Sequence, residues 1–216
     1  MRGLFVTGTG TGVGKTVAAA ALFLRYRDRA PGLRYWKPIQ TGIEQDDDTA
    51  TVAQLIGSDR VLDAGVRLPR PLSPHLAARI AGRAIDIDAI AAVPGPGQAP
   101  WIVEGAGGVL VPLNESALMV DLMMRLDLPV LVVAASGLGT INHTLLTIEA
   151  LRARRLAVAG VLMVGSPNDE NRAAIEAYGR VPVVGVLPPL DPLTPATLAA
   201  AASDLDPNGY LQACLS

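Results

Sequence analysis

The chain contains a single cysteine, Cys214, and no apolar run that reaches the roughly 18 residues of a membrane-spanning helix. One cysteine excludes a disulfide framework and a cysteine metal site, which fits a reducing compartment. Only the short apolar run 4–6 follows Met1 and Arg2, and this is too little for a secretory signal. We therefore expect a soluble, cytoplasmic protein.

An excess of charge of one sign is also lacking. The chain has 18 basic and 20 acidic residues, for a formal net charge of −2. This balance indicates neither a nucleic-acid partner nor binding to an anionic membrane. Any polyanion that the protein binds must be small and must be met by local groups.

The composition is that of a globular protein, with 50% hydrophobic and 18% charged residues. A chain of 216 residues can form one domain that buries about 70% of the surface of its unfolded state. We expect a single domain over residues 1–216.

Lysine is scarce, since Lys15 and Lys37 are the only lysines and the other basic residues are arginine. Lysine carries a compact point charge that the planar guanidinium of arginine does not replace. Both lysines fall in glycine-containing segments, so these two positions are candidates for a specific role.

Apolar runs of strand length alternate with longer helical patterns. The runs lack in/out alternation, which is typical of strands that helices cover on both faces. The expected strands are residues 3–7, 34–37, 101–103, 130–134, 157–164 and 183–187, and the expected helices are 15–26, 49–56, 117–126, 141–154 and 168–178. This order predicts an α/β fold with a doubly wound, mainly parallel sheet.

Two further segments have a clear local pattern. Residues 93–100 are rich in proline and glycine and precede an expected strand, so we interpret them as a surface connection. The alanine-rich segment 196–202 follows Pro195, and it predicts a short terminal helix that Thr194 can cap.

A glycine-rich loop, residues 7–16 with the sequence TGTGTGVGKT, stands between the first expected strand and the first expected helix. This is the order of a phosphate-binding loop, in which backbone N–H groups and the helix N-terminus surround phosphate oxygens. Lys15 can reach the β- and γ-phosphates, and the Thr16 hydroxyl can bind Mg²⁺. The spacing is a variant, because Thr9 stands where the first glycine is usual. A dinucleotide fingerprint is a weaker reading that explains neither Lys15 nor Thr16.

Two acidic features are candidates for the metal side of such a site. Glu104 comes directly after the expected strand 101–103, which is the usual position for a second carboxylate. The run Asp46, Asp47 and Asp48 precedes an expected helix. Its carboxylates can bind a metal ion, or they can simply complement the helix dipole in solvent, and the sequence leaves both readings open.

Several motifs in sequence order resemble the dethiobiotin synthetase family. They are residues 8–16, 37–42 (KPIQTG), Asp48, 73–75 (SPH), 103–108 (VEGAGG) and 137–143 (GLGTINH). Together they run to about residue 165 and are far more specific than any one of them. The resemblance covers both lysines and both histidines, although we assign His75 no chemical role.

This resemblance implies a P-loop enzyme that uses ATP and Mg²⁺ to close the urea ring of dethiobiotin from 7,8-diaminopelargonate and CO₂. The implied route is a carbamate, then a mixed anhydride with the γ-phosphate, then ring closure by the second amine. Fixed positive charge near the substrate favours both the neutral amine and the carbamate anion. The family pattern therefore puts Lys37 at the carbamate and Lys15 between the carbamate and the γ-phosphate.

The same resemblance assigns binding residues. It implies metal ligands at Thr16, Asp48 and Glu104, and nucleotide contacts at Gly12, Val13, Gly14, Lys15, Thr16 and Gly165. Substrate contacts are implied at Thr11, Thr41, Leu138, Gly139 and Asn142, of which the last three lie on a loop that reaches the other subunit's site in a homodimer. From the residues alone, an ordinary capped helix is the favoured interpretation of Asn142 and His143.

The chain departs from the family in two places. Gly10 and Gly12 stand where some members have acidic side chains, so the loop must use backbone contacts there. Residues 164–167 (VGSP) replace an asparagine-aspartate pair that reads adenine. Because a site without side chains that bond the base discriminates less, we expect relaxed or non-adenine base selection.

Two rival functions share this fold. A nucleotide-switch assembly or partitioning ATPase usually has an additional lysine early in the loop and often a basic amphipathic tail. Here Gly10 occupies the loop position, and residues 205–216 contain no basic residue. Another amide- or urea-forming ligase is the second rival, against which Lys37 and the loop 139–143 argue.

Overall fold

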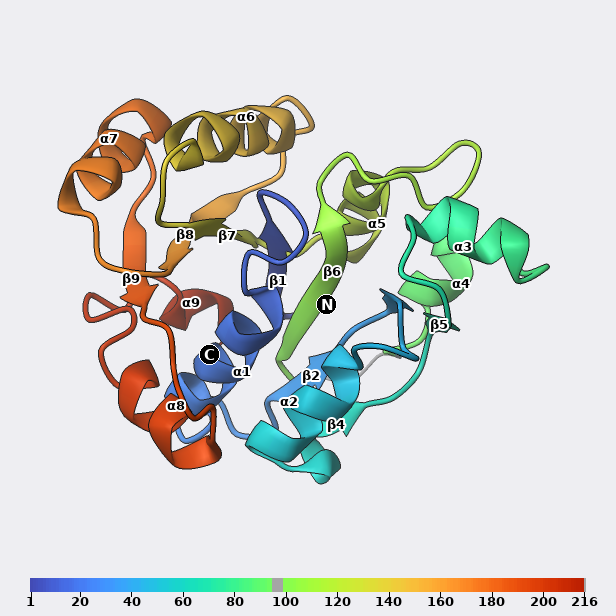
Figure 1. Cartoon of the computed structure of the whole chain (residues 1–216), viewed down its shortest axis with the longest axis horizontal. Coiled ribbons are helices and arrows are strands. Elements are labelled where there is room, and N and C mark those ends of the chain that lie inside the picture. The colour runs from blue at the N-terminus through green and yellow to red at the C-terminus, as the bar shows by residue number, and fades with distance from the viewer. Residues whose placement is uncertain (95–98, 216) are drawn as a thin grey trace.

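A computed structural model describes residues 1–94 and 99–215 of the chain. Its centre is a seven-stranded sheet in which each pair of neighbouring strands is parallel (Figure 1). Across the sheet the strands are β4 (Val61–Leu62), β2 (Arg34–Trp36), β6 (Trp101–Gly108), β1 (Gly3–Gly8), β7 (Val130–Ala135), β8 (Val158–Val164) and β9 (Val183–Leu187). The predicted α/β fold with a parallel sheet is confirmed.

Helices cover both faces of this sheet, as the unbroken apolar strands predict. In β1, Leu4 and Val6 belong to one core cluster, and Phe5, which points the other way, belongs to the second. The first face carries α1 (Lys15–Tyr26), α2 (Asp48–Ile56), α8 (Pro195–Ala202) and α9 (Gln212–Leu215). The second carries α5 (Met119–Leu126), α6 (Thr140–Arg152) and α7 (Asp169–Gly179).

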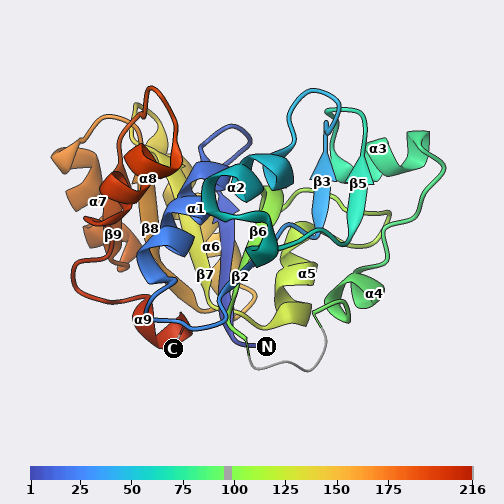
Figure 2. The same cartoon turned by 90° about the horizontal axis from the view of Figure 1, so that it is seen from below.

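A second, two-stranded sheet pairs β3 (Ile39–Thr41) with β5 (Val66–Leu68) in parallel. Figure 2 shows these strands side by side next to α3 (Pro74–Ile80), at the end of the molecule away from β9. The sequence pattern did not predict this sheet, nor β4, η1 (Ser58–Arg60), α3, α4 (Ile87–Ala91) or α9. Elements this short lack the periodicity on which such predictions depend.

The boundaries of some predicted elements were wrong. β6 continues to Gly108, so Glu104 lies within this strand and does not follow it. Pairing with β1 explains the extension, because Val6 is in register with Glu104 and Gly8 with Gly108. By contrast, α8 begins at Pro195 as predicted, and Thr194 caps it by accepting from the N–H of Thr197.

Part of the predicted surface connection 93–100 lies outside the described residues, namely 95–98. Within the described parts of the chain, no helix combines the length and the apolar character needed to cross a membrane.

Candidate active site

The glycine-rich loop joins β1 to α1 at the carboxyl end of the sheet. Gly14 adopts a left-handed conformation with φ 93°, and a Cβ atom here would lie 2.9 Å from a methyl carbon of Val164. Both the backbone and this close approach therefore require glycine. Gly14 is the N-cap of α1 and offers no side chain to the first amides of the helix. These N–H groups and the positive end of the helix dipole are available to an anion.

Lys15 begins α1 and is buried, with 7% of its surface exposed. Its ammonium Nζ donates to the carbonyl oxygen of Gly10 at 2.8 Å, so the side chain folds back across the loop. Burial lowers the pKa of Lys15 to about 8; Glu104 and Asp48 oppose this shift and Lys37 adds to it. The Lys15 ammonium is thus only partly solvated in the folded protein.

Four side chains distant in sequence converge beside Lys15. The Thr16 Oγ1 donates to Asp48 Oδ1 at 2.6 Å and lies 3.1 Å from Glu104 Oε1. The Lys37 Nζ lies 2.6 Å from Asp48 Oδ2 and 2.5 Å from Glu104 Oε1. These contacts join the start of α1, the end of β2, the start of α2 and the middle of β6 in one polar cluster.

Burial makes the charge pairing in this cluster strong. Glu104 is fully buried, and Tyr35 Oη donates to its second oxygen, Oε2, at 2.7 Å. Burial alone would lower the pKa of Lys37, but Glu104 and Asp48 outweigh it and raise the pKa above the ordinary value. Burial and the Glu104 charge raise the pKa of Tyr35 well above its ordinary value, so the phenol remains a donor.

The three consecutive aspartates divide the two roles that the sequence left open. The Asp47 carboxylate caps α2 by accepting from the N–H of Ala50 at 3.1 Å. Asp48, the first residue of α2, points to Thr16 and Lys37 instead. Asp46 is exposed. Asp47 therefore caps the helix, and Asp48 faces the polar cluster.

A cleft of about 770 Å³ opens over this cluster. It is lined by Thr11, Gly12, Gly14, Lys15, Thr16, Lys37, Thr41, Asp48 and Glu104, with Pro71, Leu72, Ser73 and Pro74 among the residues of the opposite wall. Most of the residues that the sequence analysis singled out thus share one cavity. Val13 does not line it, since its side chain packs against the core on the α1 face.

Three predicted substrate residues lie elsewhere on this chain. Leu138, Gly139 and Asn142 stand before and within the first turn of α6, all are exposed, and none lines the cleft that holds Lys37. Gly139 is the N-cap of α6, with φ 89° and no side-chain cap. Asn142 and His143 thus lie in the first turn of an ordinary helix that begins without a side-chain cap.

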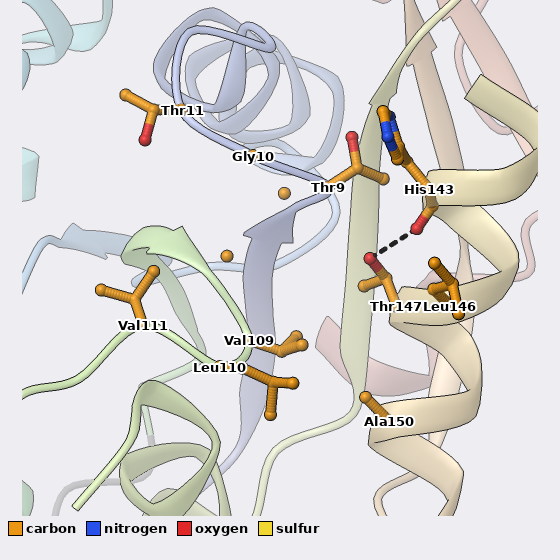
Figure 3. Close-up of a pocket in the computed structure, with 12 residues that line it drawn as sticks. Thr9, Gly10, Thr11, Val109, Leu110, Val111, His143, Leu146, Thr147 and Ala150 are labelled. Carbon is orange, nitrogen blue, oxygen red and sulfur yellow. Dashed lines mark hydrogen bonds between the residues drawn. The ribbon is translucent and has the colours of Figure 1, made fainter. Parts of the chain in front are cut away.

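A smaller, mostly apolar pocket of about 340 Å³ adjoins the cleft and shares Thr11 and Val111 with it. Figure 3 shows it between the glycine-rich loop, the segment after β6 and α6, from which His143, Leu146, Thr147 and Ala150 line it. The dashed line marks the hydrogen bond from the Thr147 hydroxyl to the carbonyl oxygen of His143, 2.8 Å long. Both Leu110 and Leu146 at this pocket are about half exposed.

Gly165 directly follows β8. The residue before it, Val164, contacts Gly14 of the glycine-rich loop, so Gly165 lies near this loop. Its φ is 131°, and a Cβ atom would collide with the Ser136 hydroxyl. The N–H of Gly165 donates to the carbonyl oxygen of Leu187 at 3.0 Å. Neither Val164 nor Gly165 offers a polar side chain at this point.

Two buried residues behind the cluster were not predicted from the sequence. Tyr35 bonds Glu104, and Gln40 bonds both neighbours of Asp48. Gln40 lies inside the motif 37–42, and this motif is the signal that could have identified it. Its residue type alone does not distinguish a structural amide from a functional one. Tyr35 occupies a run that reads as an apolar strand.

Comparison with known proteins agrees with this geometry. A family model described as "AAA domain" matches residues 2–197. The chain is 52% identical over 199 residues to the ATP-dependent dethiobiotin synthetase BioD of Paramagnetospirillum magneticum, covering 92% of this chain and 94% of the relative. It is 44% identical to the protein of the same name from Bradyrhizobium diazoefficiens over 203 residues, 93% of each chain.

Among solved structures, the MinC:MinD cell division protein complex of Aquifex aeolicus matches with a TM-score of 0.60 at 12% identity, covering 99% of this chain and 95% of that chain. This likeness shows the fold alone. The identity to the BioD proteins extends over nearly the whole length of both partners. The chain therefore belongs to the dethiobiotin synthetase family.

Proposed function

We propose that this chain closes the ureido ring of dethiobiotin from 7,8-diaminopelargonate and CO₂ at the expense of ATP. The observation that carries this proposal is the convergence of both lysines, two carboxylates and Thr16 in one cleft at the N-terminus of α1. A switch ATPase needs the phosphate loop, but its chemistry does not require a second buried lysine in the same polar cluster.

The chemistry requires each of these charges. A neutral amine of the substrate bonds to the carbon of CO₂ and loses a proton, which leaves a carbamate anion. A carbamate oxygen then attacks the γ-phosphorus and ADP leaves. The second amine attacks the carbamoyl carbon of this anhydride, and phosphate leaves as the ring closes. We assign Lys37 to the carbamate and Lys15 to the oxygens between the carbamate and the γ-phosphate.

The oxygens of Thr16, Asp48 and Glu104 fit a magnesium site. Within the part of the chain that the structure describes, no three His, Cys, Asp or Glu side chains are grouped to hold a metal ion. Magnesium requires no such group, because it is commonly held by one or two carboxylates together with substrate phosphates. The Lys37 ammonium lies between the two carboxylates, and this placement of a positive charge supports the proposal. Bound Mg²⁺ would neutralise charge on the transferring phosphoryl group.

We further propose that the substrate is held by two copies of the chain. Thr11 and Thr41 line the cleft beside the lysines. Leu138, Gly139 and Asn142 would reach the site of a partner, where the amides at the start of α6 can bind the substrate carboxylate. Exposure of the whole Leu138 side chain, together with the half-exposed Leu110 and Leu146, supports a second copy as the molecule that covers this face.

For the nucleotide we propose contacts from Gly12, Val13, Gly14, Lys15 and Thr16 to the phosphates, and from Gly165 to the base. ATP use follows from the family. Selection of the base would depend on backbone groups, because Val164 and Gly165 present no polar side chain.

One assay tests the proposed reaction. Phosphate release should require 7,8-diaminopelargonate and bicarbonate together, and the product should have the mass of dethiobiotin. Phosphate release that is equally fast without the diamine would favour the assembly ATPase, and stimulation by a different amine or acid would favour another ligase.

A further inference from the structure

Gln40 is buried, with 1% of its surface exposed, and its amide contacts the residues on either side of Asp48. On one side its Nε2 donates to Asp47 Oδ1 at 3.1 Å and to the carbonyl oxygen of Asp46 at 3.3 Å. On the other side its Oε1 accepts from the N–H and the hydroxyl of Thr49, at 3.2 and 2.9 Å. The amide therefore forms hydrogen bonds to the residues before and after Asp48, and it does not contact the Asp48 carboxylate.

Arg67 holds the same turn from the neighbouring strand. Gln40 and Arg67 are register partners in the β3–β5 sheet, and the Arg67 guanidinium bonds the second oxygen of Asp47. The Asp47 carboxylate thus receives Gln40 and Ala50 on one oxygen and Arg67 on the other. Three donors on one carboxylate leave the start of α2 little freedom to rotate.

From these contacts we propose that Gln40, with Arg67, is a positioning residue that aims the Asp48 carboxylate into the cleft. The inference rests on the proposed role of Asp48 as a metal ligand. Partners behind a metal ligand typically set its orientation, and their loss weakens metal binding without removing a ligand. The small sheet would then position two parts of the cleft, since β3 also carries Thr41 and begins two residues after Lys37.

A purely packing role for Gln40 would not need its polarity. The side chain uses its donor group toward Asp46 and Asp47 and its acceptor toward Thr49, so both ends of the amide are occupied. Methionine has nearly the same length and no comparable donor or acceptor. Gln40→Met therefore removes these hydrogen bonds while it retains most of the packing.

The test measures metal binding without turnover. Free Mn²⁺ is followed by electron paramagnetic resonance while Mn²⁺ is titrated into the full-length protein with a non-hydrolysable ATP analogue and no diamine. We expect Gln40→Met and Arg67→Met each to weaken Mn²⁺ binding about 10-fold or more. Asp86→Ala is the matched control, because it removes the N-cap of the remote helix α4 and should leave Mn²⁺ affinity unchanged.

Asp48→Asn separates the two ways in which the inference can fail. If Asp48→Asn weakens Mn²⁺ binding and the Gln40 and Arg67 variants do not, the positioning role is overturned and the metal assignment stands. If Asp48→Asn itself has no effect, the proposed metal site is wrong. Should Gln40→Met fail to fold, as judged by circular dichroism, Arg67→Met decides alone, because the Arg67 side chain is partly exposed.

Discussion

The positive charge of Lys15, to which we assign a role in binding, is costly to the fold. Its side chain is buried beside Lys37, and burial lowers its pKa to about 8. A buried ammonium loses solvation that one carbonyl contact restores only in part. The charge of Lys15 is thus retained in spite of its effect on stability.

Replacing Lys15 by glutamine should consequently separate activity from stability. We expect phosphate release by Lys15→Gln to fall by about 10²- to 10³-fold, since it removes a positive group from the transferring phosphoryl. The free energy of unfolding, measured in urea, should stay within about 1 kcal/mol of the parent value or rise. Near-normal turnover would contradict the role of Lys15.

A second buried contact fixes the C-terminal segment. The Tyr26 hydroxyl at the end of α1 bonds the Asp206 carboxylate, which also accepts from the N–H groups of Tyr210 and Leu211, each at 2.8 Å. Burial, followed by the Asp206 contact, raises the pKa of Tyr26 above its ordinary value. The segment between α8 and α9 is therefore tied to the first helix.

This contact predicts a pH dependence of stability. Above pH of about 10 the unfolded chain loses the tyrosine proton and the folded chain keeps it, so the free energy of unfolding falls as pH rises. Tyr26→Phe should lower this free energy by about 1–3 kcal/mol at pH 7, because Asp206 loses a donor. Above pH 10 its stability should fall less steeply than that of the parent. Urea unfolding at several pH values tests this, and equal slopes would refute it.

At the scale of elements, the base contact that we propose for Gly165 lies where β7 and β8 end. The structure has Ser136 after β7 and Gly165 after β8 in close contact, and the Asn171 amide bonds the carbonyl oxygen of Ser136. The Asn171 Nδ2 donor is therefore already used in a hydrogen bond within the protein. Neither Val164 nor Gly165 supplies a polar side chain for a base.

We accordingly expect weak discrimination among nucleoside triphosphates. A site that bonds the base through side chains rejects a poor match by about 10⁴-fold or more. Here the four nucleoside triphosphates should differ in kcat/KM by less than about 100-fold. The measurement is the initial rate of dethiobiotin formation with each one, and strict dependence on ATP would contradict the expectation.

At the scale of the whole molecule, the exposed apolar residues on and before α6 predict a dimer. Leu146 is 55% exposed at the rim of the smaller pocket, and the Met124 side chain on α5 is 46% exposed outside that pocket. Leu146→Asp should shift sedimentation toward the monomer, because it places a charge in the proposed interface. Met124→Asp is the control and should sediment as the parent does. Equal sedimentation of all three proteins would exclude this face as the interface.

Sites shared between two copies also predict complementation. Lys37→Gln and Asn142→Ala should each be nearly inactive alone. In a mixed dimer, one site carries both changes and the other carries neither, so a random 1:1 mixture should regain about a quarter of the parent activity. Failure of separately tagged, purified heterodimers to regain activity would show that each subunit is self-contained.

Local sequence predicted the parts of this protein that depend on neighbouring residues. The phosphate loop, α1 and α8 depend on glycine, cap and periodicity signals within about ten residues, and the apolar runs identified most strands of the large sheet. Glu104 was selected as a candidate, but its strand was cut short. An interior glutamate and the glycines after it interrupt the apolar pattern, and only pairing with β1 reveals that the strand continues.

Residue order alone specified the parallel sheet and the identity of the charged groups, because apolar runs and glycine turns act over short distances. Only the tertiary structure decided that Lys37 lies between Asp48 and Glu104. It also decided that Asp47, and not Asp48, caps α2. The hydrogen bonds from Gln40 to both neighbours of Asp48 depend on it as well. The contact between Lys37 and Glu104 joins residues 67 positions apart. Such contacts depend on the way strands and helices stack in space, which is a cooperative property of the whole chain.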